Sequence, residues 1–451
     1  FHWELAFPEV FFDAHGRRRP DGGFDAVLGN PPWDMLRADS GTAAARGADR
    51  ARAVPVRRFF RSSGVYTAQG DGHANRYQLF LERTWQLTRS GGRLGLILPS
   101  GIATDHGSAG LRRRLFDRCA VDTWLGLDNK AGIFPIHRSV RFVVITATHD
   151  GRTNELRFRS GIQDPAVLDR FASDPHQDDG GEWLRVSRSR LEAWDPQQLT
   201  VPALSSPAAL AVLTTAGGGP RRAAAHGWHV RFGRELNATD DRRHFVARPR
   251  RAGRTMLPIV EGKHLSPFQV RLDLTTRAIS RDAAAALIDP AASFARDRIA
   301  YRDVAGATNR LTLIAGLLPG GALSTHTVFV LKTPLGRRAQ WCLLALLNSL
   351  VANYLVRLNV STHVTATLMS RLPVPRPPDG SAAFRDLVTL AQELARHGME
   401  AAPGPYARLN AIVSRLYGLS SDEYAHVVSS FPLLPQSLRD RCLDAERAVP
   451  R

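Results

Sequence analysis

The stretch GFDAVLGNPPWDML, residues 23–36, joins a short apolar run to a rigid corner. FDAVL, at 24–28, is closed by a glycine and two prolines, which predicts a buried strand followed by a turn. Pro31 and Pro32 fix their φ angles and lack an N–H, so a stiff backbone presents its carbonyls as acceptors. Ligands of open α/β sheets bind just beyond the carboxyl ends of strands. We therefore expect Asn30 to Trp33 to form a ligand-binding corner.

Strand and helix patterns alternate along the chain after this corner. Residues 37–75 lack periodicity and predict a long loop or a partly disordered insert. NRYQLFLERTWQL, from Asn75, has apolar residues at helical spacing, and SGGRLGLILPSG predicts a turn, a strand and a turn. A helix from Gly110 and the strand-like segments VDTWLGL and SVRFVVITAT follow, up to about residue 148. This order predicts an α/β fold for residues 1–150.

The rest of the chain divides by composition. Residues 151–228 are weakly patterned and contain glycine-rich stretches, so we expect a connecting region. Residues 229–378 mix short strand-like runs with helices and predict an α+β domain that ends in RLPVPRPPDG. Residues 379–451 predict a helical tail, in which Gly398 caps the helix FRDLVTLAQELARHG.

The chain of 451 residues carries a formal net charge of +18. Only Lys130, Lys263 and Lys332 are lysines, so nearly all of the positive charge is arginine. A strong positive excess favours a polyanionic partner such as nucleic acid. The three cysteines are far apart, without CxxC spacing or a nearby histidine, which indicates neither a disulfide framework nor a metal site and fits a reducing, cytoplasmic setting.

The most apolar stretch, WCLLALLNSLVANYLV from Trp341, is short for a membrane span and contains Asn348, Ser349 and Asn353. It therefore predicts a buried helix, and we expect no membrane partner. The chain begins FHWELAFPEVFF, without Met and already apolar, which suggests a piece of a longer reading frame.

The corner suits an exocyclic amine. The side-chain carbonyl of Asn30 and the backbone carbonyl of Pro31 can accept its two N–H groups, which frees the nitrogen lone pair to attack an electrophilic methyl group. Trp33 can stack on the attached ring, and a base held in this way must leave the duplex. The alternative is a rigid strand-to-loop corner with a core tryptophan.

The residues NPPW resemble the (D/N)PP(Y/F/W) motif of amino-group methyltransferases that use S-adenosylmethionine. FHWELAFPEVF before the motif and YQLFLERTWQLTRSGGRLGLILPSG after it are similar to the flanking segments of large gamma-class adenine-specific DNA methylases, the type IIG-like enzymes of restriction-modification and phage-defence systems. AGIFPIHRSVRFVVI resembles a later motif of the family, which implies that Phe134 stacks on the opposite face of the flipped adenine from Trp33.

The second domain resembles the target-recognition domain of the same methylases, through FGRELNATDDRRHF, LPIVEGKHL, RIAYRDVAGATNRLTLIAGLLP and LLALLNSLVANYLVRLNVSTHVTATLMSRLPVP. The resemblance implies that this domain reads bases of double-stranded DNA in the major groove. Side chains of the types that bond base edges are candidates for this reading: Lys263, His264, Arg302, Arg310, His326 and His363.

The resemblance implies a partial Rossmann-like domain. A glycine-rich turn for S-adenosylmethionine and an acidic residue for its ribose belong before NPPW in these methylases, and neither is present here. We therefore expect the C-terminal part of an adenine-N6 methyltransferase, with its cofactor pocket mostly outside this chain and supplied by an N-terminal half or an upstream polypeptide. Asn30, Pro31, Pro32 and Trp33 are the expected catalytic residues, and no metal is implied.

Two alternatives stay open. An inactive truncated methylase or a specificity module would bind DNA without consuming cofactor. An RNA or protein-glutamine methyltransferase would use a similar NPP corner on another planar amine or amide.

Overall fold

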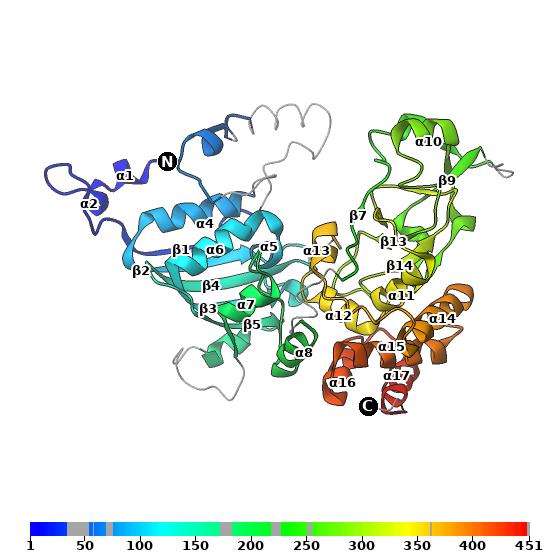
Figure 1. The fold of residues 1–451 in the computed structure, drawn as a ribbon. Coiled ribbons are helices and arrows are strands. Elements are labelled where there is room, and N and C mark those ends of the chain that lie inside the picture. Colours follow the sequence, from blue (N-terminus) through cyan, green and yellow to red (C-terminus); the bar gives the residue numbers. More distant parts are fainter. Residues whose placement is uncertain are drawn as a thin grey trace. The chain divides into compact units, whose positions relative to one another are not determined.

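The computed structural model describes residues 1–33, 54–56, 58–68, 75–171, 183–217, 227–249, 255–360 and 363–448. The chain divides into two compact units, Phe1–Pro207 and Ala208–Arg451 (Figure 1).

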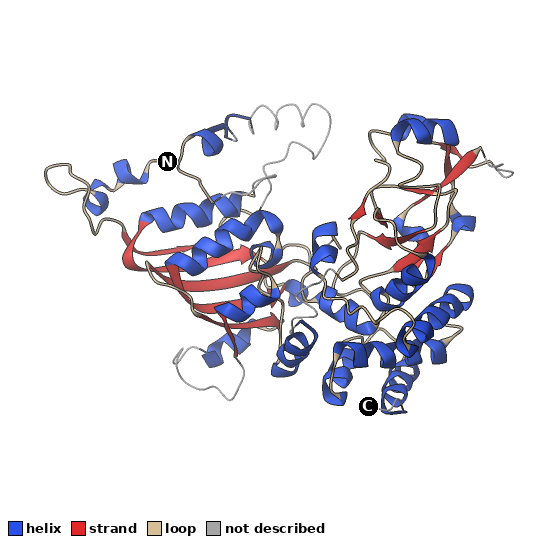
Figure 2. Ribbon diagram, in the orientation of Figure 1, coloured by secondary structure: helices blue, strands red, loops and turns tan. Residues whose placement is uncertain are grey.

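Unit 1 is built on a six-stranded sheet with the order β1-β2-β4-β3-β5-β6 (Figure 2). Its strands are β1 (Phe24–Gly29), β2 (Thr88–Pro99), β3 (Cys119–Asp128), β4 (Arg141–His149), β5 (Glu155–Ile162) and β6 (Leu184–Ser187). The pairs β1–β2 and β3–β5 are parallel, and the other three neighbouring pairs are antiparallel. The sheet is therefore mixed, with β1 at one edge and β6 at the other.

The helices of unit 1 are α1 (Trp3–Ala6), α2 (Pro8–Phe11), α4 (Arg76–Leu87), α5 (Gly101–Thr104), α6 (Ala109–Arg118) and α7 (Arg188–Trp194), with 3₁₀ turns at His106–Ser108, Asn129–Ala131 and Pro165–Phe171. Helix α4 begins where the Asn75 amide donates to Gln78 Oε1 at 3.0 Å, and it buries Tyr77, Leu81 and Trp85. Helices α4 and α6 lie together over the sheet (Figure 2). Apolar spacing of about 3.6 residues gives each helix this one buried face.

Two stretches differ from the sequence-based expectation. Part of the long loop expected at 37–75 is helical, at 54–56 and 58–62, and residues 37–53, 57 and 69–74 of it lie outside the described residues. The connecting region expected at 151–228 contributes β5 and β6 to the sheet. A buried arginine interrupts the alternation of apolar residues in β5. The Arg157 Cζ atom lies 4.2 Å from the centroid of the Trp183 ring.

Unit 2 contains two four-stranded sheets, β15-β9-β12-β8 and β14-β13-β16-β7, and the hairpin β10-β11. Its strands are β7 (Phe232–Gly233), β8 (Val246–Ala247), β9 (Met256–Val260), β10 (Leu265–Ser266), β11 (Gln269–Val270), β12 (Arg277–Ser280), β13 (Arg298–Arg302), β14 (Ala315–Leu318), β15 (Leu323–Ser324) and β16 (Val328–Leu331). The turns at Arg242–His244, Gly262–His264 and Leu272–Leu274 are 3₁₀.

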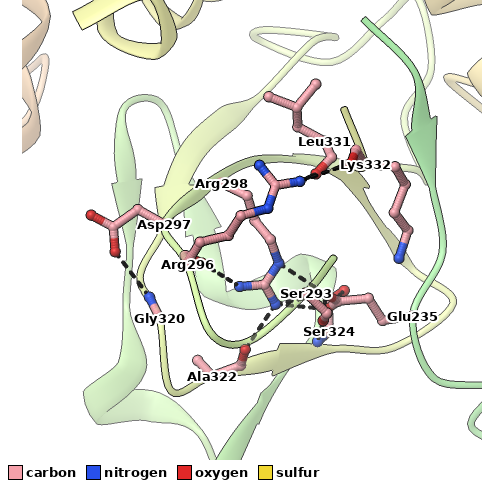
Figure 3. A network of polar contacts seen from close by, with 10 residues as sticks. All are labelled: Glu235, Ser293, Arg296, Asp297, Arg298, Gly320, Ala322, Ser324, Leu331 and Lys332. Carbon is pink, nitrogen blue, oxygen red and sulfur yellow. Dashed lines mark hydrogen bonds and ion pairs between the residues drawn. The ribbon is translucent and has the colours of Figure 1, made fainter. Parts of the chain in front are cut away.

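A buried ion pair joins three of these segments (Figure 3). The Arg298 Nε and Nη2 atoms donate to the two oxygens of Glu235, each at 2.9 Å, and both side chains are fully buried. The same carboxylate accepts from the Ser324 amide and hydroxyl, each at 2.8 Å, and from the Ser293 hydroxyl. Losing one partner of such a pair leaves an uncompensated buried charge, which costs roughly 3–5 kcal/mol. The network thus fixes the chain beside β7 against β13 and β15.

The helices of unit 2 are α8 (Pro207–Gly217), α10 (Arg281–Leu287), α11 (Arg337–Leu347), α12 (Leu350–Arg357), α13 (Ala366–Arg371), α14 (Ala382–His397), α15 (Pro403–Tyr417), α16 (Ser421–Ser429) and α17 (Gln436–Ala448). Asn348 Oδ1 accepts from the Ala315 amide at 3.1 Å, and its Nδ2 donates to the Ala315 carbonyl at 3.0 Å. A buried asparagine therefore ties the end of α11 to β14. The α/β class and the helical C-terminal region predicted from the sequence are confirmed.

In the described part of the chain, no single helix has the length and apolar character of a membrane span; only α11 and α12 together, bent by 60°, pass that test. All three cysteines are buried and free. Among the described residues, no group of three or more His, Cys, Asp or Glu side chains is arranged to hold a metal ion.

Candidate active site

The corner predicted from the sequence lies at the carboxyl end of β1. Gly29 pairs with Leu96 of the parallel strand β2, and the chain leaves the sheet at Asn30. Asn30 and Pro32 are exposed, Pro31 is buried and Trp33 is half-buried. The buried proline anchors the turn, and the exposed asparagine is accessible to a ligand.

Three aromatic rings meet beside this corner. The centroid of Trp33 lies 5.9 Å from that of Phe134 and 5.8 Å from that of Phe142, with interplanar angles of 84° and 34°. Phe134 and Phe142 lie 5.0 Å apart in an edge-to-face pair. These rings pack on an apolar cluster formed by the sheet, which includes Leu125, Leu127 and Ile162. The structure thus brings together Trp33 and Phe134, which are 101 positions apart in the sequence and are separated by the strands β2 and β3.

The mutual orientation of Trp33 and Phe134 bears on the expected stacking. A base held between two faces needs two parallel rings separated by two stacking distances, about 7 Å. Here the two rings touch edge to face, so one ring must turn before a base can enter between them. The Trp33 Nε1 atom is buried without a hydrogen-bond partner in the described part of the chain. Burying a donor without an acceptor costs free energy. This cost favours rotation of the indole when a ligand offers an acceptor.

Asn129 positions Phe134, and the sequence analysis did not identify it. Its side chain is fully buried directly after β3. Oδ1 accepts from the Phe134 amide at 2.9 Å, and Nδ2 donates to the carbonyls of Phe134 and Ile136 at 3.0 and 3.1 Å. One side chain thereby closes the loop between β3 and β4. The only signal in the sequence is a polar residue at the end of an apolar strand, which also fits an ordinary turn.

The same loop is basic. Lys130, His137 and Arg138 are exposed on it, and Arg138 Nη1 donates to the Lys130 carbonyl at 2.8 Å. Gly132 has a φ of +80°, and a Cβ at this position would come within 2.9 Å of the Arg138 guanidinium. Glycine therefore lets the arginine fold back over the loop, where cations flank the aromatic corner.

Four of the six residues proposed to read bases lie around one end of β13 in unit 2. Thr327 lies in the turn next to His326. Its hydroxyl accepts a hydrogen bond from the Gly262 amide at 3.0 Å, and its carbonyl accepts one from the Asp303 amide at 3.0 Å. Arg302 packs over Gly262, next to Lys263, and His363 forms a β-bridge with Val304. This group is Lys263, Arg302, His326 and His363.

The other two candidates have different environments. His264 is buried, its Nδ1 accepts from the Glu261 amide at 3.0 Å, and burial lowers its pKa. A neutral histidine in this position holds the turn at Gly262–His264 and does not face solvent. Arg310 forms an ion pair with Glu400.

Residues 1–134 match the family model described as Eco57I restriction-modification methylase. A comparison with curated protein sequences finds no match.

Several solved structures resemble the chain. One describes the type IIL restriction-modification enzyme MmeI in complex with DNA, with 11% identity and a TM-score of 0.47, over 94% of this chain and 56% of that one. Another is the type IIG restriction endonuclease BpuSI, with 13% identity and a TM-score of 0.35, over 94% of this chain and 54% of that one. A DrdV–DNA complex has 9% identity and a TM-score of 0.46, over 84% and 44%. The chain thus spans about half the length of these proteins.

Proposed function

We propose, from the match of residues 1–134 to the Eco57I restriction-modification methylase family, that the chain is part of a site-specific DNA methyltransferase that methylates the N6 amine of adenine. The observation that carries the proposal is the Asn30 to Trp33 corner at the carboxyl end of β1, with Phe134 held against it. The supporting features are the net charge of +18 and the exposed cations of the loop that bears Phe134. Double-stranded DNA is the proposed partner, and the cytoplasm the proposed location.

Each residue of the corner has a proposed task. Asn30 Oδ1 and the Pro31 carbonyl accept the two N–H groups of the flipped adenine, which directs the lone pair of N6 away from the ring plane. Trp33 stacks on one face of the base, and Phe134 covers the other once the rings have separated. Lys130 and Arg138 neutralise the phosphates that flank the flipped nucleotide. S-adenosylmethionine supplies an electrophilic methyl group when bound.

The described residues do not provide a complete pocket for that cofactor. In this part of the chain, no turn with two or more glycines follows a strand of the six-stranded sheet. Such a turn is what lets backbone approach a nucleotide cofactor at a strand end.

The free edge of β1 indicates where the cofactor pocket would be completed. Within the described residues β1 pairs only with β2, and the side chain of Leu28 is 80% exposed. A further strand, parallel to β1 as β2 is, would end beside Asn30, and its following loop would face the adenine amine. We infer that an N-terminal half or an upstream polypeptide supplies this strand together with the cofactor-binding turn.

The test is transfer of labelled methyl groups from S-adenosylmethionine to mixed-sequence duplex DNA. It compares this chain, the chain with its native upstream sequence, and Asn30→Ala in both. We expect the longer form to methylate DNA and Asn30→Ala to lose transfer at least 100-fold while DNA binding stays within a few-fold. Asn154→Ala, at an exposed position of the same unit, is the matched control and should keep full activity.

Three results would count against the proposal. Equal activity of Asn30→Ala would remove the corner from the chemistry. Preferred transfer to RNA or to a glutamine-containing protein would reassign the substrate. DNA binding without transfer in either form would favour a non-catalytic specificity module.

A further inference from the structure

A second built site lies in unit 2, at the carboxyl end of β13. The side chain of Asp303 is only 3% exposed, and its Oδ2 lies 3.1 Å from Arg234 Nη2 and 3.3 Å from His363 Nδ1. Its Oδ1 is also buried and has no hydrogen-bond partner in the described part of the chain. A carboxylate is thus held at the base of the site, below two side chains that are about half exposed.

Arg234 is fixed from two further directions. Its guanidinium lies over the Phe329 ring, 4.9 Å from the centroid, and Phe329 stacks in turn on Tyr301 at 5.4 Å and 13°. The next residue, Glu235, is locked into the buried ion pair with Arg298 (Figure 3). The guanidinium therefore keeps one direction, although its side chain is 52% exposed. Its N–H groups outside the Asp303 bond remain for a ligand.

A fixed arginine beside a buried carboxylate suits a neutral acceptor pair better than a phosphate. The Asp303 charge lies 3.1 Å from the guanidinium and would repel a phosphate at the same place. Guanine carries no net charge, and its O6 and N7 match two parallel N–H groups of an arginine. Arg302, at the same end of β13, donates its Nε to the neutral Val304 carbonyl and suits a flanking phosphate, whereas Lys263 is paired with Glu261 at 2.8 Å.

We propose that Arg234 reads a guanine edge in the major groove, with Asp303 as the residue that positions its guanidinium. This inference rests on the proposed DNA-methylase function and adds one base-reading residue to it. Pre-organisation by Asp303 and Phe329 removes part of the entropy cost of ordering a long side chain on DNA. The site therefore contributes selectivity at one base pair.

The experiment selects bound duplexes from a random-sequence library and needs no methyl transfer. It uses the wild-type chain, Arg234→Ala and Asp303→Asn, and Arg338→Ala as the control, because Arg338 is also an exposed arginine over a phenylalanine ring. We expect Arg234→Ala to lose the preference for one guanine and to keep every other position of the selected sequence. Asp303→Asn should weaken the same preference without lowering overall affinity.

A substitution in the DNA gives a second measurement, whose main result needs only the wild-type chain. Replacing that guanine by 7-deazaguanine should weaken binding of the wild-type chain roughly tenfold and leave Arg234→Ala unaffected. Uniform weakening across all sequences in Arg234→Ala, with a smaller salt slope, would make Arg234 a phosphate contact and overturn the inference. A wild-type chain that selects no sequence would instead overturn the site-specific function itself.

Discussion

At the residue scale, single polar side chains set the geometry of both candidate sites. Asn129 holds the loop of Phe134, and Asp303 holds Arg234. Each is buried and complements its partners. Asn129 offers amide donors and an acceptor to a loop backbone, and Asp303 offers a carboxylate to a guanidinium. A buried polar residue of this type fixes direction as well as energy, because its partners have no alternative once water is excluded.

Asn129→Asp tests the first of these roles. The carboxylate cannot donate to the Phe134 and Ile136 carbonyls, so we expect the loop to open and the Phe134 amide to exchange hydrogen at least tenfold faster. In the chain with its native upstream sequence, for which we expect DNA methylation, Asn129→Asp should also lower methyl transfer. The measurement is residue-resolved hydrogen exchange, beside the methyl-transfer assay.

The control for this prediction is Thr153→Val, at the other end of β3. The Thr153 hydroxyl donates to the Cys119 carbonyl at 2.7 Å and accepts from the Val121 amide at 3.0 Å. Loss of this hydroxyl leaves a buried amide without an acceptor, which should lower the free energy of unfolding by about 1–3 kcal/mol. Hydrogen exchange at the Phe134 amide should not change. An unchanged Phe134 amide in Asn129→Asp would show that the loop does not depend on Asn129.

At the element scale, the free edge of β1 predicts a change on pairing. In the chain with its native upstream sequence, the β1 amides that point away from β2 should exchange more slowly than in the chain alone. β6, the opposite edge of the same sheet, should not change, and it serves as the internal control. Leu28→Ser should not change the stability of the chain alone, because Leu28 is already 80% exposed there. In the longer form, where the added strand would cover Leu28, the same substitution should weaken the protection of the β1 amides. Equal protection of β1 in both forms would contradict the inferred parallel strand.

Elements with a clear apolar period were predictable from the sequence. β2 and the helices α4 and α6 each bury one set of regularly spaced side chains. β1 lies where the sequence predicts a strand, but the expectation that it is buried is wrong, because it lies at the edge of the sheet and none of its residues is buried. β5 was not predicted because Arg157 occupies a buried position, with its charge over the Trp183 ring, and so interrupts the apolar pattern of the strand. Several strands of unit 2 are two residues long, which is too short for an alternating apolar pattern to be recognised in the sequence. The NPPW corner was found from its backbone chemistry, but Asn129 and Asp303 were not, since their roles depend on contacts between distant segments.

At the scale of the whole molecule, the charge of +18 overstates the number of cations available to DNA. Arg112 is fully buried, and Arg357 donates to the Ser430 and Arg310 carbonyls, so these two charges count in the net charge but do not reach a phosphate. Arginines paired with a carboxylate, such as Arg83 with Glu4 and Arg298 with Glu235, are already cancelled in that sum. The composition that suggested a polyanionic partner therefore also serves the fold.

This division of the arginines predicts the salt dependence of DNA binding. Each phosphate neutralised contributes about −0.9 to the slope of log K against log salt concentration. If all of the net charge acted on DNA, the slope would be about −16. Because buried arginines reach no phosphate, we expect the slope of a chain making about 6–10 phosphate contacts, or roughly −5 to −9. The measurement is the dissociation constant on one duplex between 50 and 200 mM salt, over which affinity should fall about 10³- to 10⁵-fold. Lys130→Ala should reduce the slope by about one, whereas Arg83→Ala, whose partner is Glu4, should not change it. A slope shallower than about −2 would mean that few of these cations face a nucleic acid at all.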